Sequence, residues 1–235
     1  NTATITDSGV DIGGSSAGTG NTITYGLNTV ADASWSGFST TASGIHYRNG
    51  VNANIRYNTV TSNLMTITTT GITLSAATVP SGVTYTNTIS NNTLNINSTG
   101  GTSVNANGIG FGYGIATGSI VGSSNIINIT QSATAAATGQ INGILAGYTY
   151  LSSALNSNTI TFVQNNSSGA NSGQVTGIGN NPGAAVTGST QTINNNVITF
   201  KQNTTGGTYS GALIYIMSHN SATAYAIGTG TISTN

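Results

Sequence analysis

Cysteine is absent from this sequence, and charged side chains nearly are. The 235 residues include no Cys, which excludes disulfide bonds and thiolate metal sites. Only 3% of the residues are charged, whereas ordinary domains carry about a quarter. The formal net charge is zero, and there is no Glu. The charged residues are Asp7, Asp11, Asp32, Arg48, Arg56 and Lys201.

The scarcity of charge excludes several kinds of function. Three basic residues cannot form the basic face that nucleic acid or anionic lipid requires. No apolar run approaches the roughly 18 residues of a membrane helix. No acidic residue follows Asp32, so most of the chain cannot hold the two facing carboxylates that glycosidic hydrolysis ordinarily needs. Arg48 and Arg56 also have no carboxylate in the adjoining downstream repeats, which lyase chemistry would need for metal ligands.

Candidate metal ligands are equally sparse. Asp7 and Asp11 lie among glycines in DSGVDIGG, which could be a calcium loop or a polar N-terminal turn. Two carboxylates are few for the roughly six to eight oxygens that Ca²⁺ takes, so we favour the turn. His46 and His219 are far apart in the chain and have no acidic residue or Cys near them. We therefore expect no metal, no cofactor, no catalytic residue and no enzyme activity.

Two short boxes alternate along the chain. The first is Asn-x-apolar-x-(aromatic or Ile), and the second is Gly-(Ile/Val)-x-(Tyr/Phe). Copies of the first box begin at Asn21, Asn63, Asn92, Asn125, Asn158 and Asn196. Copies of the second begin at Gly44, Gly82, Gly108, Gly143, Gly177 and, with one extra residue, Gly211. Alternation of this kind indicates stacked repeats rather than one globular core.

The first box has the period of a β-strand. In NTITF, Ile160 and Phe162 point one way while Thr159 and Thr161 point the other, as in a strand buried on one face. An apolar residue usually stands three positions before the box Asn, which predicts a strand, a two-residue polar corner and a second strand. Asn suits such a corner because it tolerates left-handed backbone geometry. Stacked corner Asn side chains could also hydrogen-bond to one another.

The spacing of the boxes favours a solenoid. The first-box Asn residues are 29 to 42 residues apart, which indicates constant strands joined by variable loops. A β-propeller or a sandwich is the alternative, but a propeller blade needs four antiparallel strands and each repeat shows only two or three strand signals. We predict an all-β parallel β-helix (β-solenoid) of about six to seven coils with minimal helix. Residues 1–235 would form a single domain, with 1–20 as an N-terminal cap or inter-subunit segment and 217–235 as the last coil or a C-terminal inter-subunit strand.

The corner pattern in ISNNTLNI and INNNVITF resembles the parallel β-helix repeat of pectate-lyase-like proteins, phage tailspikes and secreted bacterial adhesins. The resemblance covers residues 57–216 and implies the fold but no particular function. The Asn-, Thr-, Ser- and Gly-rich, almost uncharged composition further resembles large surface proteins of the Bacteroidota. The chain begins NTATITDSGV, without Met or a signal peptide, which we interpret as a mature or excised segment.

Two sets of residues are candidates for ligand contact. The first is an outward column midway between the two inward residues of each first box: Thr24, Thr66, Asn95, Asn128, Thr161 and Thr199. It could bind glycan or ice, although Thr and Asn also simply solvate a strand face. The second set comprises aromatic residues that could stack on sugars: Trp35, Tyr113, Tyr148 and Tyr150. For Trp35, in the longest stretch between boxes, we favour the alternative of a loop packed on the end of the solenoid.

The function we expect is structural. The repeat predicts an elongated rod with exposed strand edges at its ends, and the neutral surface has no charge repulsion to oppose self-association. We therefore expect a non-enzymatic, extracellular segment of a bacterial surface fibre, filament or adhesin stalk, which associates with itself end to end or within a larger repeat array. The alternatives are a polysaccharide- or ice-binding module and a degenerate carbohydrate-active enzyme.

Overall fold

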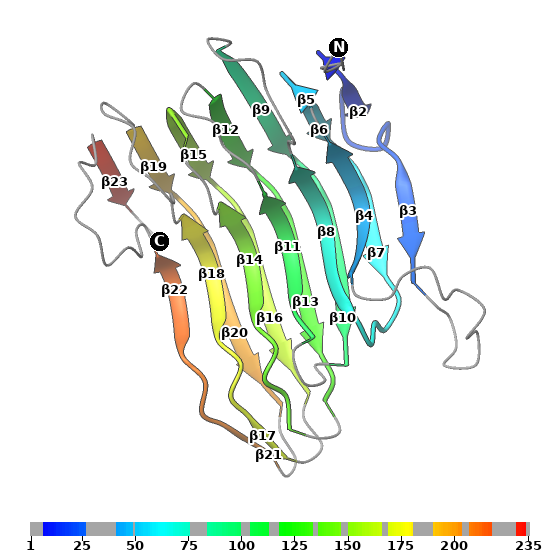
Figure 1. The fold of residues 1–235 in the computed structure, drawn as a ribbon, viewed down its shortest axis with the longest axis vertical. Coiled ribbons are helices and arrows are strands. Elements are labelled where there is room, and N and C mark those ends of the chain that lie inside the picture. Colours follow the sequence, from blue (N-terminus) through cyan, green and yellow to red (C-terminus); the bar gives the residue numbers. More distant parts are fainter. Residues whose placement is uncertain are drawn as a thin grey trace, which may run out of the picture.

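The structure is a parallel β-solenoid, as predicted (Figure 1). The computed structural model describes residues 7–26, 41–48, 50–75, 84–99, 104–112, 118–133, 136–146, 150–165, 169–180, 190–203, 207–217 and 229–233. Every regular element in these ranges is a β-strand. No helix suited in length and hydrophobicity to crossing a membrane occurs among these residues.

Three parallel sheets form the sides of the solenoid. Sheet 1 contains β2 (Asp11–Gly13), β6 (Asn54–Arg56), β9 (Tyr85–Ser90), β12 (Gly118–Ser123), β15 (Ser152–Asn156), β19 (Thr190–Asn194) and β23 (Thr229–Ser233). Sheet 2 contains β3 (Thr22–Tyr25), β7 (Thr59–Ser62), β10 (Thr93–Ser98), β13 (Ile126–Gln131), β16 (Thr159–Gln164) and β20 (Val197–Gln202). Sheet 3 contains β4 (Thr41–Arg48), β8 (Thr68–Ser75), β11 (Ala106–Phe111), β14 (Ile141–Ala146), β18 (Val175–Asn180) and β22 (Leu213–Met217).

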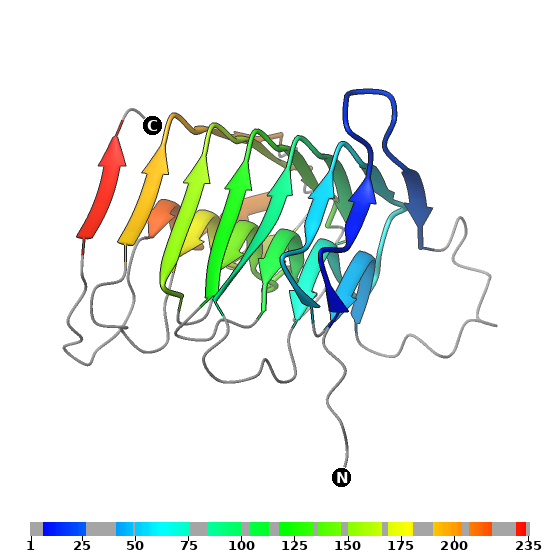
Figure 2. The ribbon, with the colours of Figure 1, turned by 90° about the horizontal axis from the view of Figure 1, so that it is seen from above.

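The chain visits sheets 1, 2 and 3 in turn, and each strand pairs with its counterpart in the next coil. In the described residues, sheets 2 and 3 have six strands each and sheet 1 has seven. Figure 2 shows the coils behind one another along the axis, from blue at the N-terminal end to the red β23. Two small pairs lie beside the main sheets: β1 (Asp7–Ser8) with β5 (Gly50–Val51), and β17 (Gly169–Asn171) with β21 (Gly207–Tyr209).

The core consists of columns of apolar side chains in register. Ile127 pairs with Leu94 on one side and Ile160 on the other, and all three are fully buried. Phe162 is 1% exposed, which confirms its predicted inward position. Tyr25 and Phe200, in the first and last strands of sheet 2, are partly buried against this core. Aliphatic and aromatic residues at period two thus account for the burial of sheet 2.

An asparagine ladder runs along the corner between sheets 1 and 2. In each of the first five coils, the backbone N–H and the side-chain Nδ2 of one Asn both donate to Oδ1 of the Asn in the next coil, over 2.9–3.2 Å. From the second coil on, Nδ2 also donates to a sheet 1 carbonyl of the preceding coil at 2.9 Å. The ladder comprises Asn21, Asn58, Asn92, Asn125, Asn158 and Asn196. The predicted hydrogen bonding between corner Asn residues is therefore confirmed.

The left-handed residue of the corner is not the ladder Asn but the residue just before it. Positive φ angles of 55–59° occur there in the second to sixth coils, at Tyr57, Asn91, Ser124, Ser157 and Asn195. Tolerance of left-handed geometry, which we expected of the box Asn, is therefore required at the preceding position, where non-glycine residues accept a cost of about 1–2 kcal/mol. The box Asn is needed for its amide, which donates and accepts at once.

The structure corrects the second copy of the first box. The ladder Asn is Asn58, in YNTVTS, rather than Asn63. Asn63 lies beyond β7, where its N–H and Nδ2 donate to the carbonyls of Tyr25 and Gly26. The box template missed Asn58 because Ser62 occupies the place of the aromatic or Ile residue. With Asn58 included, ladder residues are 33 to 38 positions apart, a more even spacing than the one inferred from sequence.

Two copies of the second box are also corrected. Sheet 3 uses Gly71, in GITL, which the template missed, and the Tyr85 of the copy at Gly82 begins β9 in sheet 1. Gly82 itself lies outside the described residues. The copy at Gly211 begins four residues before the position that aligns with Gly177. Strand pairing places Tyr215, not Gly211, opposite Gly177. The resulting column in sheet 3 is Gly44, Gly71, Gly108, Gly143, Gly177 and Tyr215.

The glycines of this column are required by close approach of the next coil. A Cβ on each would lie 2.3–2.9 Å from the carbonyl oxygen of its counterpart one coil further on. At Gly143 the added atom would lie 2.5 Å from Gly177 O and 2.7 Å from a methyl carbon of Ile160. Both neighbours are held by the strand pairing and the core, so neither can move away cheaply.

Gly143→Ala should therefore destabilise the fold by about 1–3 kcal/mol, the usual cost of overpacking. Gly110→Ala is the matched control, because it lies on an adjoining strand of the same sheet and its new Cβ would meet nothing nearer than 3.9 Å. Urea unfolding followed by circular dichroism measures both. Equal stability of the two variants would contradict the close-approach explanation.

Asn125→Ala should destabilise the fold strongly. Asn125 is fully buried, accepts two hydrogen bonds from Asn92 and donates to Asn158 and Ile89. Because each buried polar group left unpaired costs about 1–3 kcal/mol, the expected loss is at least ~3 kcal/mol. Asn21→Ala, at the exposed end of the same ladder, should cost only about 0.5–1.5 kcal/mol. The free energies of unfolding in urea test this order, and a larger loss in Asn21→Ala would reverse it.

Candidate functional site

The outward column expected on sheet 2 exists, with one member replaced. Strand pairing aligns Thr24 with Thr61, then Asn95, Asn128, Thr161 and Thr199 in consecutive coils. Thr66 does not belong to it, because it follows β7 and lies outside any strand. The sequence pattern places Thr66 in this column because it begins the second copy of the first box at Asn63 instead of Asn58. The spacing of 33 to 38 residues between ladder Asn residues is the signal that could have identified Thr61.

A second outward column lies beside the first. It aligns Thr22, Thr59, Thr93, Ile126, Thr159 and Val197. Every member is β-branched, and Ile126 and Val197 are large apolar side chains that are 46% and 58% exposed. We call these two columns the outer array of sheet 2. Neighbouring strands lie about 4.8 Å apart and alternate residues about 6.6–6.8 Å apart, so the array is a regular grid of hydroxyl, amide and methyl groups.

Some polar groups of the outer array bond to one another. Asn128 Nδ2 donates to Asn95 Oδ1 at 3.0 Å. This contact uses one donor and one acceptor at the centre of the array, while the remaining groups of these partly exposed amides face outward. The array can therefore offer hydrogen bonds to a ligand, and its Thr and Asn side chains do not change charge near neutral pH.

Of the aromatic candidates, only Tyr150 falls within the described residues, and it is in the core. Its ring is 5% exposed, and its hydroxyl donates to Phe111 O at 3.2 Å. This position contradicts the expectation that Tyr150 stacks on a sugar, because a buried ring has no free face. Trp35, Tyr113 and Tyr148 lie outside the described residues.

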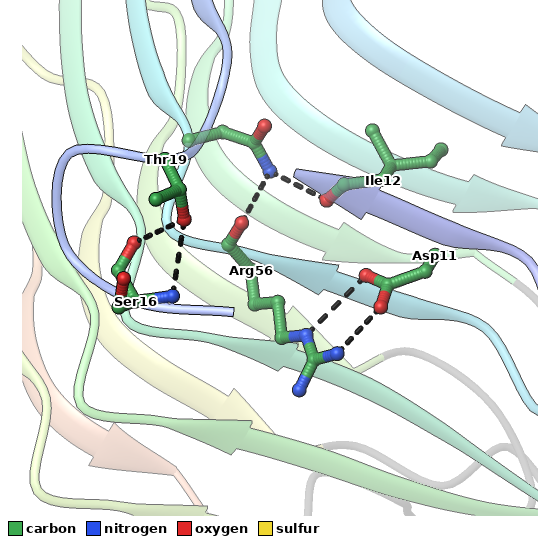
Figure 3. Close-up of polar contacts among 6 residues, drawn as sticks. Asp11, Ile12, Ser16, Thr19 and Arg56 are labelled. Atoms are coloured by element: carbon green, nitrogen blue, oxygen red, sulfur yellow. Dashed lines mark hydrogen bonds and ion pairs between the residues drawn. The ribbon is translucent and has the colours of Figure 1, made fainter. Parts of the chain in front are cut away.

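The N-terminal segment carries an ion pair between the first two coils (Figure 3). The Arg56 guanidinium, on β6, donates from Nε to Asp11 Oδ1 at 3.3 Å and from Nη2 to Asp11 Oδ2 at 2.5 Å. The side-chain hydrogen bond from Arg56 to Asp11, together with the carboxylate charge, raises the pKa of Arg56. Asp11, one of the two carboxylates of the calcium-loop alternative, is thus bound to a cation. Ser16 and Thr19 form a hydrogen-bonded turn beside this pair.

In the part of the chain that the structure describes, the other titratable groups do not gather into a site. His46 is exposed, as expected for an outward position, and its Nε2 lies 2.7 Å from Ser75 Oγ. His219 lies outside the described residues. Within the described ranges, no three His, Cys, Asp or Glu residues are placed to share a metal ion. Between Arg56 and Lys201 the sequence has no charged residue at all, so most coils present only neutral groups.

Tyr25 is a titratable group that the fold affects strongly. Burial against the core raises its pKa to about 12, and the side-chain hydrogen bond with Thr69 Oγ1 at 2.8 Å opposes this rise. The hydroxyl also donates to Thr70 O at 2.9 Å, which favours the neutral phenol. The phenol is therefore neutral in the folded protein at any physiological pH. It joins the first strand of sheet 2 to the second strand of sheet 3.

No protein-family model matches this chain, and no curated protein or solved structure shows significant similarity to it.

Stability should fall at alkaline pH through Tyr25. Its pKa is about 12 in the folded protein against 10.0 ordinarily, so the neutral form stabilises the fold fully below pH ~10, and that contribution is lost as the pH rises towards ~12. The loss is at most about 3 kcal/mol. Tyr25→Phe cannot ionise, so its free energy of unfolding should decline less between pH 9 and 11.5 in urea titrations. Parallel declines in both proteins would show that Tyr25 is not responsible.

Proposed function

We propose that this chain is a non-enzymatic structural protein: a β-solenoid segment of an extracellular bacterial surface fibre, filament or adhesin stalk. The observation that carries the proposal is the asparagine ladder, which ties consecutive coils into one continuous rod. The ladder Asn residues of the second to sixth coils are no more than 2% exposed, so the rod depends on an internal hydrogen-bonded spine rather than on a compact core alone.

The surface supports the same proposal. The sequence between Arg56 and Lys201 is uncharged, so charge repulsion does not oppose contact between rods. Strands β3 and β4 at one end, and β20 and β22 at the other, each pair on one side only within the described residues, and edges of this kind can template another strand. Self-association, end to end or within a larger repeat array, follows from these features. The extracellular bacterial origin is supported by the corner repeat and the Asn- and Thr-rich composition.

A glycan- or ice-binding module is the second candidate, and the observation that favours it is the register of the outer array. Two columns of β-branched and amide side chains repeat on every strand of sheet 2 without a charged residue among them. A regular grid of hydroxyl, amide and methyl groups suits a ligand that is itself periodic, such as a polysaccharide chain or an ice surface.

The structural role is tested by electron microscopy of the native material. Rods, filaments or a longer parent polypeptide that contains these coils are the expected result. Uniform compact monomers that never associate, with no longer parent chain, would refute the proposal.

The binding role is tested with a glycan array and an ice-recrystallisation assay. If the outer array binds, Thr161→Tyr should reduce the signal at least tenfold, because a large ring interrupts the regular grid. Thr192→Tyr is the matched control, since Thr192 faces outward on sheet 1 with similar partial exposure. Equal effects of the two substitutions would assign binding elsewhere, and silence of the unmodified protein in both assays would remove this candidate.

A further inference from the structure

Two Asn-Gly dipeptides lie in interior strands of sheet 3. Asn107 precedes Gly108 on β11, and Asn142 precedes Gly143 on β14. Both glycines belong to the glycine column, where a Cβ on either would lie 2.5 Å from the carbonyl oxygen of the next coil. The two asparagines are paired with each other in the strand register. The packing of the coils therefore keeps each of these asparagines next to a glycine that cannot be replaced without strain.

An asparagine followed by glycine can lose its side-chain amide spontaneously. The glycine N attacks Cγ of the asparagine, and the new C–N bond closes a five-membered succinimide. The Cγ–Nδ2 bond breaks, and the amide leaves as ammonia with the proton of the glycine N–H. Water then opens the ring and gives aspartate, or isoaspartate in which the backbone runs through the former side chain. Glycine favours ring closure because it has no Cβ to shield its N and its backbone rotates freely.

The fold opposes ring closure at both sites. A residue in a parallel strand has ψ of about +115°, at which the N of the next residue points away from the side chain. Strands β11 and β14 lie inside a six-stranded sheet and are paired on both sides. The side chains are also held: Asn142 Nδ2 donates to Asn107 Oδ1 at 2.8 Å, and Asn107 Nδ2 donates to Thr70 Oγ1 at 3.2 Å. The glycine N can therefore reach Cγ only after the strand has opened.

The product of the reaction does not fit the folded coil. Asn142 is 5% exposed, and an aspartate there would lose the donor to Asn107 Oδ1 and place a carboxylate beside that oxygen. The sequence has no charged residue between Arg56 and Lys201, so the adjoining coils supply no cation to compensate the buried charge. Isoaspartate would lengthen the backbone of β14 by one methylene group and disturb its register with β11 and β18.

We infer that Asn107 and Asn142 are deamidation sites that the fold protects while the coils remain stacked, and that their reaction in an unfolded chain prevents that chain from folding again. The glycine column that the coils need thus gives the unfolded chain a limited period in which it can refold. This inference goes beyond the proposed structural role and does not depend on it, because it concerns the chemistry of the chain wherever the chain acts.

The rates are measured on the folded protein and on the chain held in guanidinium chloride, in the same mildly alkaline buffer. Peptide mass spectrometry should show conversion of Asn107 and Asn142 in denaturant, and at least ~100-fold slower conversion in the folded protein, because the folded chain must first open. Asn128 is the internal control, since its Nδ2 also donates to an Asn but the next residue is Ile129, whose side chain shields its N. Equal rates in the two states, or no faster conversion than at Asn128 in denaturant, would overturn the inference.

Refolding measures the consequence of the reaction. Each conversion adds one negative charge to a chain whose formal net charge is zero, so ion exchange separates converted from unconverted chains. Peptide mapping of each fraction identifies the converted residue and distinguishes Asn49, in the third Asn-Gly of the sequence, which lies outside the described residues. Chains converted at Asn107 or Asn142 should fail to refold or should unfold at a lower denaturant concentration. An unchanged unfolding midpoint of these chains would refute the protective role of the fold.

Asn142→Asp reproduces one product without the altered backbone, and Asn128→Asp is its matched control. Both substitutions remove an Nδ2 that donates to the Asn of the preceding coil, and both add one negative charge. Asn128 is partly exposed on the outer array, whereas Asn142 is buried. The midpoint of Asn142→Asp should therefore be the lower of the two, and a failure of this variant to fold is the extreme of the same result. Equal midpoints of the two variants would contradict the inference.

Discussion

One asparagine per coil fixes the position of that coil against its neighbours on both sides. Its backbone and side-chain amides donate to the next asparagine, and its Nδ2 also reaches a carbonyl of the coil before. These hydrogen bonds form in only one register of the two coils. If a coil shifted by one residue relative to its neighbour, the donors and acceptors of the buried amide would be left unpaired. The register of all three sheets, and with it every column of the core, depends on this constraint.

The glycine column imposes the complementary restriction on the opposite side of the coil. The ladder requires particular hydrogen-bonding groups of neighbouring coils to meet. The glycine column requires residues without a side chain, because the carbonyl oxygen of the next coil occupies the space where a Cβ would lie. The apolar side chains then fill the volume between these two lines, with Leu94, Ile127 and Ile160 on one level of successive strands. Tyr215 departs from the column only at the last described strand of sheet 3, where no further strand of that sheet is described.

The outward positions obey neither restriction, and most of them are uncharged for a different reason. Thr, Ser, Asn and Gly solvate the strands by hydrogen bonding, so the fold does not need surface charge. Charged side chains are confined to residues before 57 and to Lys201, and the described ion pair joins Asp11 to Arg56 between the first two coils. Most coils therefore present neutral groups on their outward positions.

The sequence by itself determined the fold class, because period-two apolar residues and polar corners recur often enough to predict stacked parallel strands. It also determined the hydrogen-bonding role of the corner Asn and the inward place of Phe162. Only the tertiary structure decided the register of the second coil, where Asn58, Thr61 and Gly71 replace Asn63, Thr66 and Gly82. A local template cannot find these residues, since their identity is set by what lies one coil above and below, some 33 to 38 residues away. The burial of Tyr150 and the exposed place of Tyr215 were beyond the sequence for the same reason: both follow from which coil is the neighbour.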